Sequence, residues 1–74
     1  MDSETIIRVT EKFIQYPWGV SMMARVTGLP KPTIERIYRT LSSWGVIEFC
    51  DSGLHLTVGP LIALGIVQRQ LAGE

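Results

Sequence analysis

The chain has 74 residues, of which 46% are hydrophobic and 19% are charged, and its formal net charge at pH 7 is zero. A chain of this length folds into one domain with a small core and has little surface for a deep catalytic cleft, so we predict that the protein is not an enzyme. The high apolar content and modest charge exclude a largely disordered chain.

The first expected element is a helix from Ser3 to about Tyr16. Ser3 is the expected N-cap, and Glu4 places a negative charge in the first turn, where it favours the helix dipole. Apolar residues then recur at helical spacing at positions 6, 9, 13 and 14. Pro17 ends the helix because its ring clashes with a continuing helical backbone.

A short second helix and a tight turn follow. Ser21 is the expected N-cap of this helix, which has apolar residues at positions 22, 23, 24 and 26. Gly28 can adopt the left-handed backbone conformation that ends a helix, and Leu29 after it can pack into the core.

A third helix is expected from Lys31 to about Trp44, with Pro32 in its first turn and Gly45 at its end. Its inward face carries apolar residues at steps of three and four, namely Ile34, Ile37, Tyr38, Leu41 and Trp44. Its outward face carries Lys31, Thr33, Arg36 and Arg39. Two helices joined by a glycine turn over about residues 21–44 predict a helix-turn-helix whose second helix reads the major groove of DNA.

A β-hairpin is expected next, over about residues 46–58. Two strands, 46–50 and 54–58, flank the polar turn Asp51-Ser52-Gly53. Alternation puts Ile47 and Phe49 on one face of the first strand. In the second strand Leu54, Leu56 and Val58 share a face, and Glu48, His55 and Thr57 are expected to face outward. A hairpin directly after a helix-turn-helix is the wing of a winged helix-turn-helix.

The last expected helix covers about residues 60–72, beginning at Pro60. Its apolar stripe consists of Leu61, Leu64, Val67 or Gln68, and Leu71. The stripe either packs on the first helix or pairs with a second copy of the chain, and the sequence leaves both open. Leu61, Leu64, Val67 and Leu71 are therefore the candidate dimer or partner surface.

The expected fold class is mainly α with a small β-hairpin. We predict a single winged helix-turn-helix domain over residues 1–74, with a three-helix core, a two-stranded wing and a C-terminal helix.

Charge is segregated along the chain. Between residues 18 and 45 there are four basic residues and the single acid Glu35, whereas the remainder has an excess of three negative charges. This distribution suits a protein that contacts double-stranded DNA with one surface. Four basic residues neutralise few phosphates, so one copy should bind DNA weakly, and we expect a homodimer. The candidate DNA-binding residues are Arg25, Lys31, Pro32, Thr33, Arg36, Arg39 and His55.

Residues for catalysis or metal binding are scarce. Cys50 is the only cysteine and His55 the only histidine, so we expect no metal site, no cofactor and no catalytic triad. Cys50 is expected to act as a small apolar residue and not as a redox sensor. The N-terminus is acidic, unlike a secretory signal, and no apolar run approaches the roughly 20 residues needed to cross a bilayer. We therefore expect a cytoplasmic protein without a membrane partner.

Three blocks of sequence carry a family resemblance. They are Thr27-Gly28-Leu29-Pro30-Lys31-Pro32-Thr33-Ile34-Glu35-Arg36, Leu41-Ser42-Ser43-Trp44-Gly45-Val46-Ile47, and Leu56-Thr57-Val58-Gly59-Pro60-Leu61 with Leu64-Gly65 beyond. In this order, over about residues 20–65, they resemble the DNA-binding domain of the IclR family of bacterial transcriptional regulators. The resemblance implies a winged helix-turn-helix that binds operator DNA as a dimer, with Thr33 and Arg36 at DNA-contact positions.

The sequence also departs from the family pattern. Pro32 stands where a small hydroxyl residue is usual, Leu56 replaces a usual aromatic residue, and the wing lacks arginine and lysine. The family's C-terminal effector-binding domain has no counterpart in these residues, so no small-molecule effector is expected. A stand-alone domain of this kind resembles small regulators of phages and other mobile elements.

We therefore predict a sequence-specific DNA-binding transcriptional regulator. The alternative is a winged helix that acts as a protein–protein interaction module without binding DNA, for example a phage-encoded inhibitor or an assembly factor. Zero net charge, a wing without basic residues and an apolar last helix favour this alternative.

Overall fold

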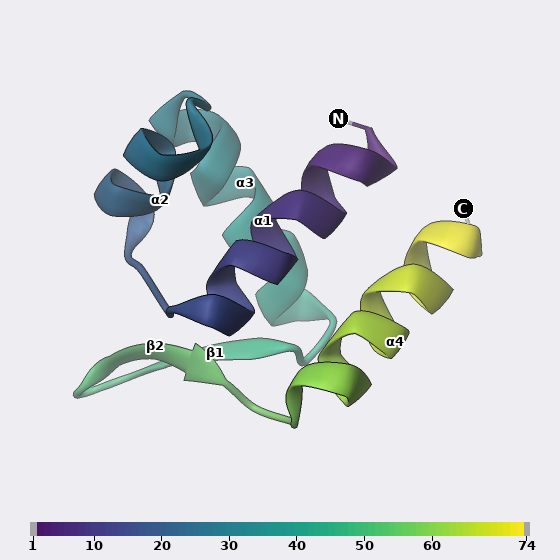
Figure 1. Ribbon diagram of the computed structural model, residues 1–74. Coiled ribbons are helices and arrows are strands. Elements are labelled where there is room, and N and C mark those ends of the chain that lie inside the picture. Colours follow the sequence, from purple (N-terminus) through teal and green to yellow (C-terminus); the bar gives the residue numbers. More distant parts are fainter. Residues whose placement is uncertain (1, 74) are drawn as a thin grey trace.

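The computed structural model describes residues 2–73 and has the predicted winged helix-turn-helix fold (Figure 1). In chain order the elements are α1 (Ser3–Gln15), α2 (Val20–Thr27), α3 (Lys31–Ser43), β1 (Ile47–Cys50), β2 (Gly53–Leu56) and α4 (Pro60–Ala72). Within these residues the architecture is mainly helical, with one two-stranded antiparallel hairpin after the helix-turn-helix.

The helix N-caps lie one or two residues earlier than the sequence suggested. Asp2, and not Ser3, caps α1, because its Oδ1 accepts a hydrogen bond of 2.8 Å from the backbone N–H of Thr5. Hydrogen bonding with Thr5 lowers the pKa of the Asp2 carboxyl. Helix α2 begins at Val20 with Gly19 as its N-cap, so Ser21 lies inside the first turn and caps nothing.

The hydrophobic core draws on α1, α2, α3, α4 and the start of the hairpin. Its buried apolar residues are Ile6, Val9, Phe13, Met23, Ile34, Ile37, Tyr38, Leu41, Val46, Ile47, Ala63 and Val67. The rings of Phe13 and Tyr38 meet edge to face with their centroids 5.5 Å apart. The Tyr38 hydroxyl donates a 2.6 Å hydrogen bond to the carbonyl of Trp18, which fixes the α1–α2 connection against α3.

Two glycines with positive φ form the ends of α2 and α3. Gly28, at φ 74°, donates its N–H to the carbonyl of Ala24, and Leu29 packs against the core, as predicted. Gly45, at φ 75°, follows Trp44, which is the C-cap of α3 and is half-buried against the core. These turns fix the direction of α3 and of the hairpin that follows it.

The hairpin is shorter than expected and has a two-residue turn. The register pairs Ile47 with Leu56, Glu48 with His55, and Phe49 with Leu54. Ile47 and Phe49 share one face of β1, as expected, but Ile47 is buried and Phe49 is 81% exposed. Figure 1 shows the reason, since the hairpin projects beyond the helices with its turn farthest from α4.

Helix α4 packs against α1 in the same chain, with Ala63 and Val67 buried and Leu71 half-buried against the core. Figure 1 shows the two helices lying side by side in opposite directions. Val67 is therefore not at the surface, because the stripe that contains it closes the monomer's core. The large apolar residues of α4 that are exposed are Leu61 and Ile62 in its first turn. No helix within residues 2–73 is long and apolar enough to cross a membrane.

Candidate nucleic-acid interface

The two faces of α3 differ in burial and charge. Ile34, Ile37 and Leu41 are fully buried, which fixes the rotation of the helix about its axis. At about 100° per residue, Arg36 and Arg39 lie on the opposite side, and both are exposed. One face of α3 thus anchors it, while two guanidinium groups stand in solvent.

Within residues 2–73, neither arginine forms an ion pair with an acidic side chain. Glu35, the acid of this segment, is exposed and forms no ion pair with Arg36 or Arg39. The ion pair found within the described chain joins His55 to Glu48 on the hairpin. No described residue therefore occupies the guanidinium donors of Arg36 and Arg39, which can bind a ligand.

The N-terminal end of α3 is also accessible. Pro30 is its N-cap and provides no side-chain cap hydrogen bond. The backbone N–H of Thr33 donates to the carbonyl of Pro30 at 3.0 Å. Lys31 and Pro32 are exposed and Thr33 is half-buried beside them. This end combines the positive pole of the helix with a lysine, an arrangement that favours a phosphate.

The other two candidate residues lie on other elements. Arg25 is exposed in the last turn of α2. His55 belongs to a hairpin cluster, because its Nε2 is 2.8 Å from Glu48 Oε1 and its Nδ1 is 3.2 Å from Cys50 Sγ. Residues paired across the two strands share a face, so His55 and Glu48 lie on the side opposite Phe49 and Leu54.

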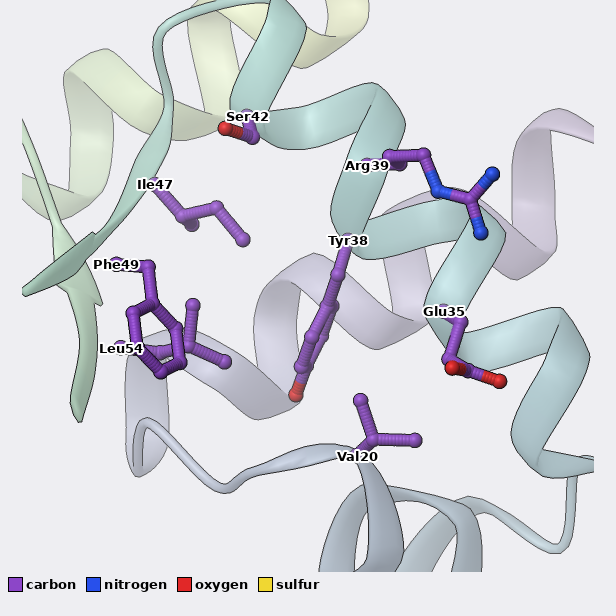
Figure 2. Close-up of a pocket in the computed structure, with 8 residues that line it drawn as sticks. All are labelled: Val20, Glu35, Tyr38, Arg39, Ser42, Ile47, Phe49 and Leu54. Atoms are coloured by element: carbon purple, nitrogen blue, oxygen red, sulfur yellow. The ribbon is translucent and has the colours of Figure 1, made fainter.

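A cleft between α3 and the hairpin was not expected from the sequence. Its volume is about 350 Å³, and its lining residues are Val20, Glu35, Tyr38, Arg39, Ser42, Ile47, Phe49 and Leu54 (Figure 2). Figure 2 shows Tyr38 between the apolar hairpin residues and the two charged α3 residues Glu35 and Arg39, with the guanidinium of Arg39 directed away from Phe49. The only signal in the sequence was Phe49, an aromatic residue near the hairpin turn.

The order helix, turn, second helix and hairpin defines a winged helix-turn-helix, a class of small DNA-binding domains. Residues 15–49 match the family model of the IclR helix-turn-helix domain, which confirms the family resemblance of this segment. The segment is an IclR-type helix-turn-helix, and it covers α2, α3 and the start of the hairpin. Searches of curated proteins and of solved structures gave no significant match.

The family match points to DNA binding in transcription regulation and to a non-enzymatic protein. Among residues 2–73 no group of histidine, cysteine, aspartate and glutamate side chains is arranged to hold a metal ion. Apart from the acid Glu35, the polar side chains of α3 are basic groups and hydroxyls, which suit recognition of phosphates and base edges.

Proposed function

We propose that this protein is a sequence-specific transcriptional regulator that reads the major groove of DNA with α3. The observation that carries the proposal is the pair of exposed arginines, Arg36 and Arg39, on a helix whose other face is buried. The major groove of B-DNA is about 12 Å wide and admits an α-helix. Arginine can donate two hydrogen bonds to one guanine or to a phosphate, so either residue can supply specificity.

The remaining candidate residues would position α3 on the duplex. Lys31 and Thr33 lie at the end of α3 that enters the groove, and Arg25 lies on the helix before it. Contacts of this kind to phosphates fix register and orientation without reading sequence. Pro32, between Lys31 and Thr33, has no polar side-chain atom and can contribute only apolar contact, for instance with a thymine methyl group.

A homodimer is part of the proposal. Each phosphate that a protein neutralises adds to affinity through counterion release, and one copy provides only four basic residues on the relevant segment. Two copies on a palindromic site would double this number. Of the candidate dimer residues, Leu61 is 85% exposed and Leu64 is half-buried, whereas Val67 contributes to the monomer's own core.

Selection of binding sites from a random pool of duplex DNA tests the proposal. We expect an enriched motif, and a two-fold symmetric motif with half-sites about 10 bp apart would support the dimer. A pool that remains random after selection at low salt would contradict sequence-specific binding.

The cleft favours a second candidate function, binding of another protein through the wing. Phe49, an aromatic side chain 81% exposed beside an apolar cleft, is the type of residue that anchors protein interfaces. A protein that uses only this surface would show no affinity for DNA at low salt and would lose its partner on Phe49→Ser substitution. DNA binding that survives this substitution and is lost on substitution of the arginines would reject the second candidate.

A further inference from the structure

The face of the hairpin opposite the cleft brings a thiol, an imidazole and a carboxylate together. Cys50 Sγ is 3.2 Å from His55 Nδ1, and His55 Nε2 is 2.8 Å from Glu48 Oε1. Ser52 Oγ lies 3.0 Å from the same sulfur. The β1–β2 pairing places Glu48 opposite His55, and Cys50 is two residues beyond Glu48 on the same face.

This order of groups is the arrangement that activates a nucleophile. A thiol lies within hydrogen-bonding reach of a base, and a third group orients the base. The Glu48 carboxylate accepts a hydrogen bond from His55 Nε2–H, and in this tautomer Nδ1 is free to take a proton from Cys50. The resulting imidazolium lies between two negative charges, so the thiolate–imidazolium form is stabilised from both sides.

The pKa of Cys50 is lowered and the pKa of His55 is raised, and both shifts favour the thiolate–imidazolium form. Hydrogen bonds with Ser52 lower the pKa of Cys50 most, and the hydrogen bond and positive charge of His55 lower it further. Partial desolvation lowers the pKa of His55, but hydrogen bonds and Coulombic attraction from Glu48 and Cys50 outweigh it and raise the pKa overall. The groups that act on the pair within the described chain thus come from the hairpin itself, with none from α3 or α4.

We propose that Cys50 is an activated thiol on the wing that forms mixed disulfides with low-molecular-weight disulfides. The Cys50 thiolate attacks one sulfur of the disulfide, a new sulfur–sulfur bond forms, and the old one breaks. The leaving thiolate takes the proton held by His55, so the products are a mixed disulfide on Cys50 and one free thiol. The proposal departs from the expectation from sequence that Cys50 acts as a small apolar residue and not as a redox sensor.

The surroundings of the cluster limit it to stoichiometric modification. Glu48 is exposed, His55 and Cys50 are half-buried, and the cleft lies on the other face of the hairpin. Cys50 does not line that cleft, so we expect stoichiometric modification and not turnover. The modification does not depend on the proposed DNA-binding role, because α3 takes no part in it.

The test is the rate of reaction with 5,5′-dithiobis(2-nitrobenzoic acid), an aromatic disulfide whose acidic leaving thiol remains a coloured thiolate near neutral pH. Cys50 is the only cysteine, so the signal reports one site. The same chain in concentrated urea is the reference for a cysteine without neighbours. We expect the pH at which the rate is half-maximal to be lower for the native chain than for the unfolded chain. Partial shielding of the sulfur lowers the rate at every pH and does not change this midpoint.

Three variants assign the effect. An ordinary cysteine is only a few per cent thiolate at pH 7, so loss of the base in His55→Gln should slow the reaction roughly three- to tenfold and raise the midpoint. Glu48→Gln should act in the same direction and less strongly, whereas Glu11→Gln, an exposed glutamate on α1, should leave the rate unchanged. Circular dichroism checks that each variant is folded.

Equal midpoints in the native and unfolded wild-type chain would overturn the proposal. So would a His55→Gln variant that is folded and reacts as fast as the wild type with the same midpoint. Should His55→Gln not fold, the wild-type profile and Glu48→Gln decide the question.

Discussion

Replacing both arginines of α3 with alanine separates binding from folding. Arg36 and Arg39 are exposed and make no side-chain hydrogen bond or ion pair within the described chain, so the double substitution should change the free energy of unfolding by no more than about 0.5 kcal/mol. Alanine and arginine are both good helix formers, so α3 itself should persist. An effect on DNA binding would therefore not come from unfolding.

The expected loss of binding follows from the kind of contact that each arginine makes. A base contact by arginine provides about 1–3 kcal/mol of discrimination, so two such contacts correspond to roughly 2–6 kcal/mol, or between about 30-fold and 10⁴-fold in affinity. If both arginines contact phosphates instead, the slope of log K against log salt should fall by about 2, since each phosphate contact contributes about 0.9.

Fluorescence anisotropy with the selected duplex, measured over a salt series, distinguishes these cases. The matched control is Arg8→Ala with Arg69→Ala, two arginines on α1 and α4 that are exposed and lie outside the helix-turn-helix. Thermal unfolding of both double variants checks stability. Unchanged affinity and salt slope in the α3 variant, or an equal loss in the control, would refute the reasoning.

Further predictions concern the turns and the core. Gly28→Ala should destabilise the fold by about 1–2 kcal/mol because of its left-handed backbone, and Gly28→Asn by less; equal urea midpoints for the wild type and both variants would contradict this. Tyr38→Phe removes the hydrogen bond to Trp18 and should cost about 1–2 kcal/mol near pH 7 in urea unfolding. Burial raises the pKa of Tyr38 above its ordinary value of 10.0, so the free energy of unfolding of the wild type should fall as pH rises beyond 10. Tyr38→Phe should lose less over the same range. Parallel plots of unfolding free energy against pH for the two proteins would be inconsistent with burial of the hydroxyl. Val67→Ala should lower the free energy of unfolding by roughly 2 kcal/mol at any protein concentration, whereas Leu61→Ala should leave the monomer's stability unchanged. A larger loss from Leu61→Ala than from Val67→Ala would show that α4 is stabilised by a second copy.

The arrangement of α3 could be predicted because its signals are local. Apolar residues at steps of three and four define the buried face of one helix, and Gly28 and Pro32 mark the turn before it. The helix starts were less accurate, because Asp2 and Ser3 are both good N-caps and Gly19 caps α2 without any side chain.

The hairpin was harder to predict from the sequence than α3, because the register of its strands depends on the length of the turn. The sequence suggested a three-residue turn over residues 51–53, which would place Phe49 opposite His55. The structure has Gly53 paired with Cys50 in a two-residue turn, and this brings His55 opposite Glu48. A slip of one residue exchanges the faces of a strand, so the Cys50 cluster could not be found without the register. Exposure of Phe49 likewise depends on how far the helices extend beneath the strand.

The most direct test of DNA reading by α3 is an NMR titration of the labelled protein with the selected duplex, observing the Nε–H signals of the arginine side chains. We predict that the signals of Arg36 and Arg39 shift on binding while those of Arg8 and Arg69 stay in place. Unmoved Arg36 and Arg39 signals in a saturated complex would contradict recognition of DNA by α3.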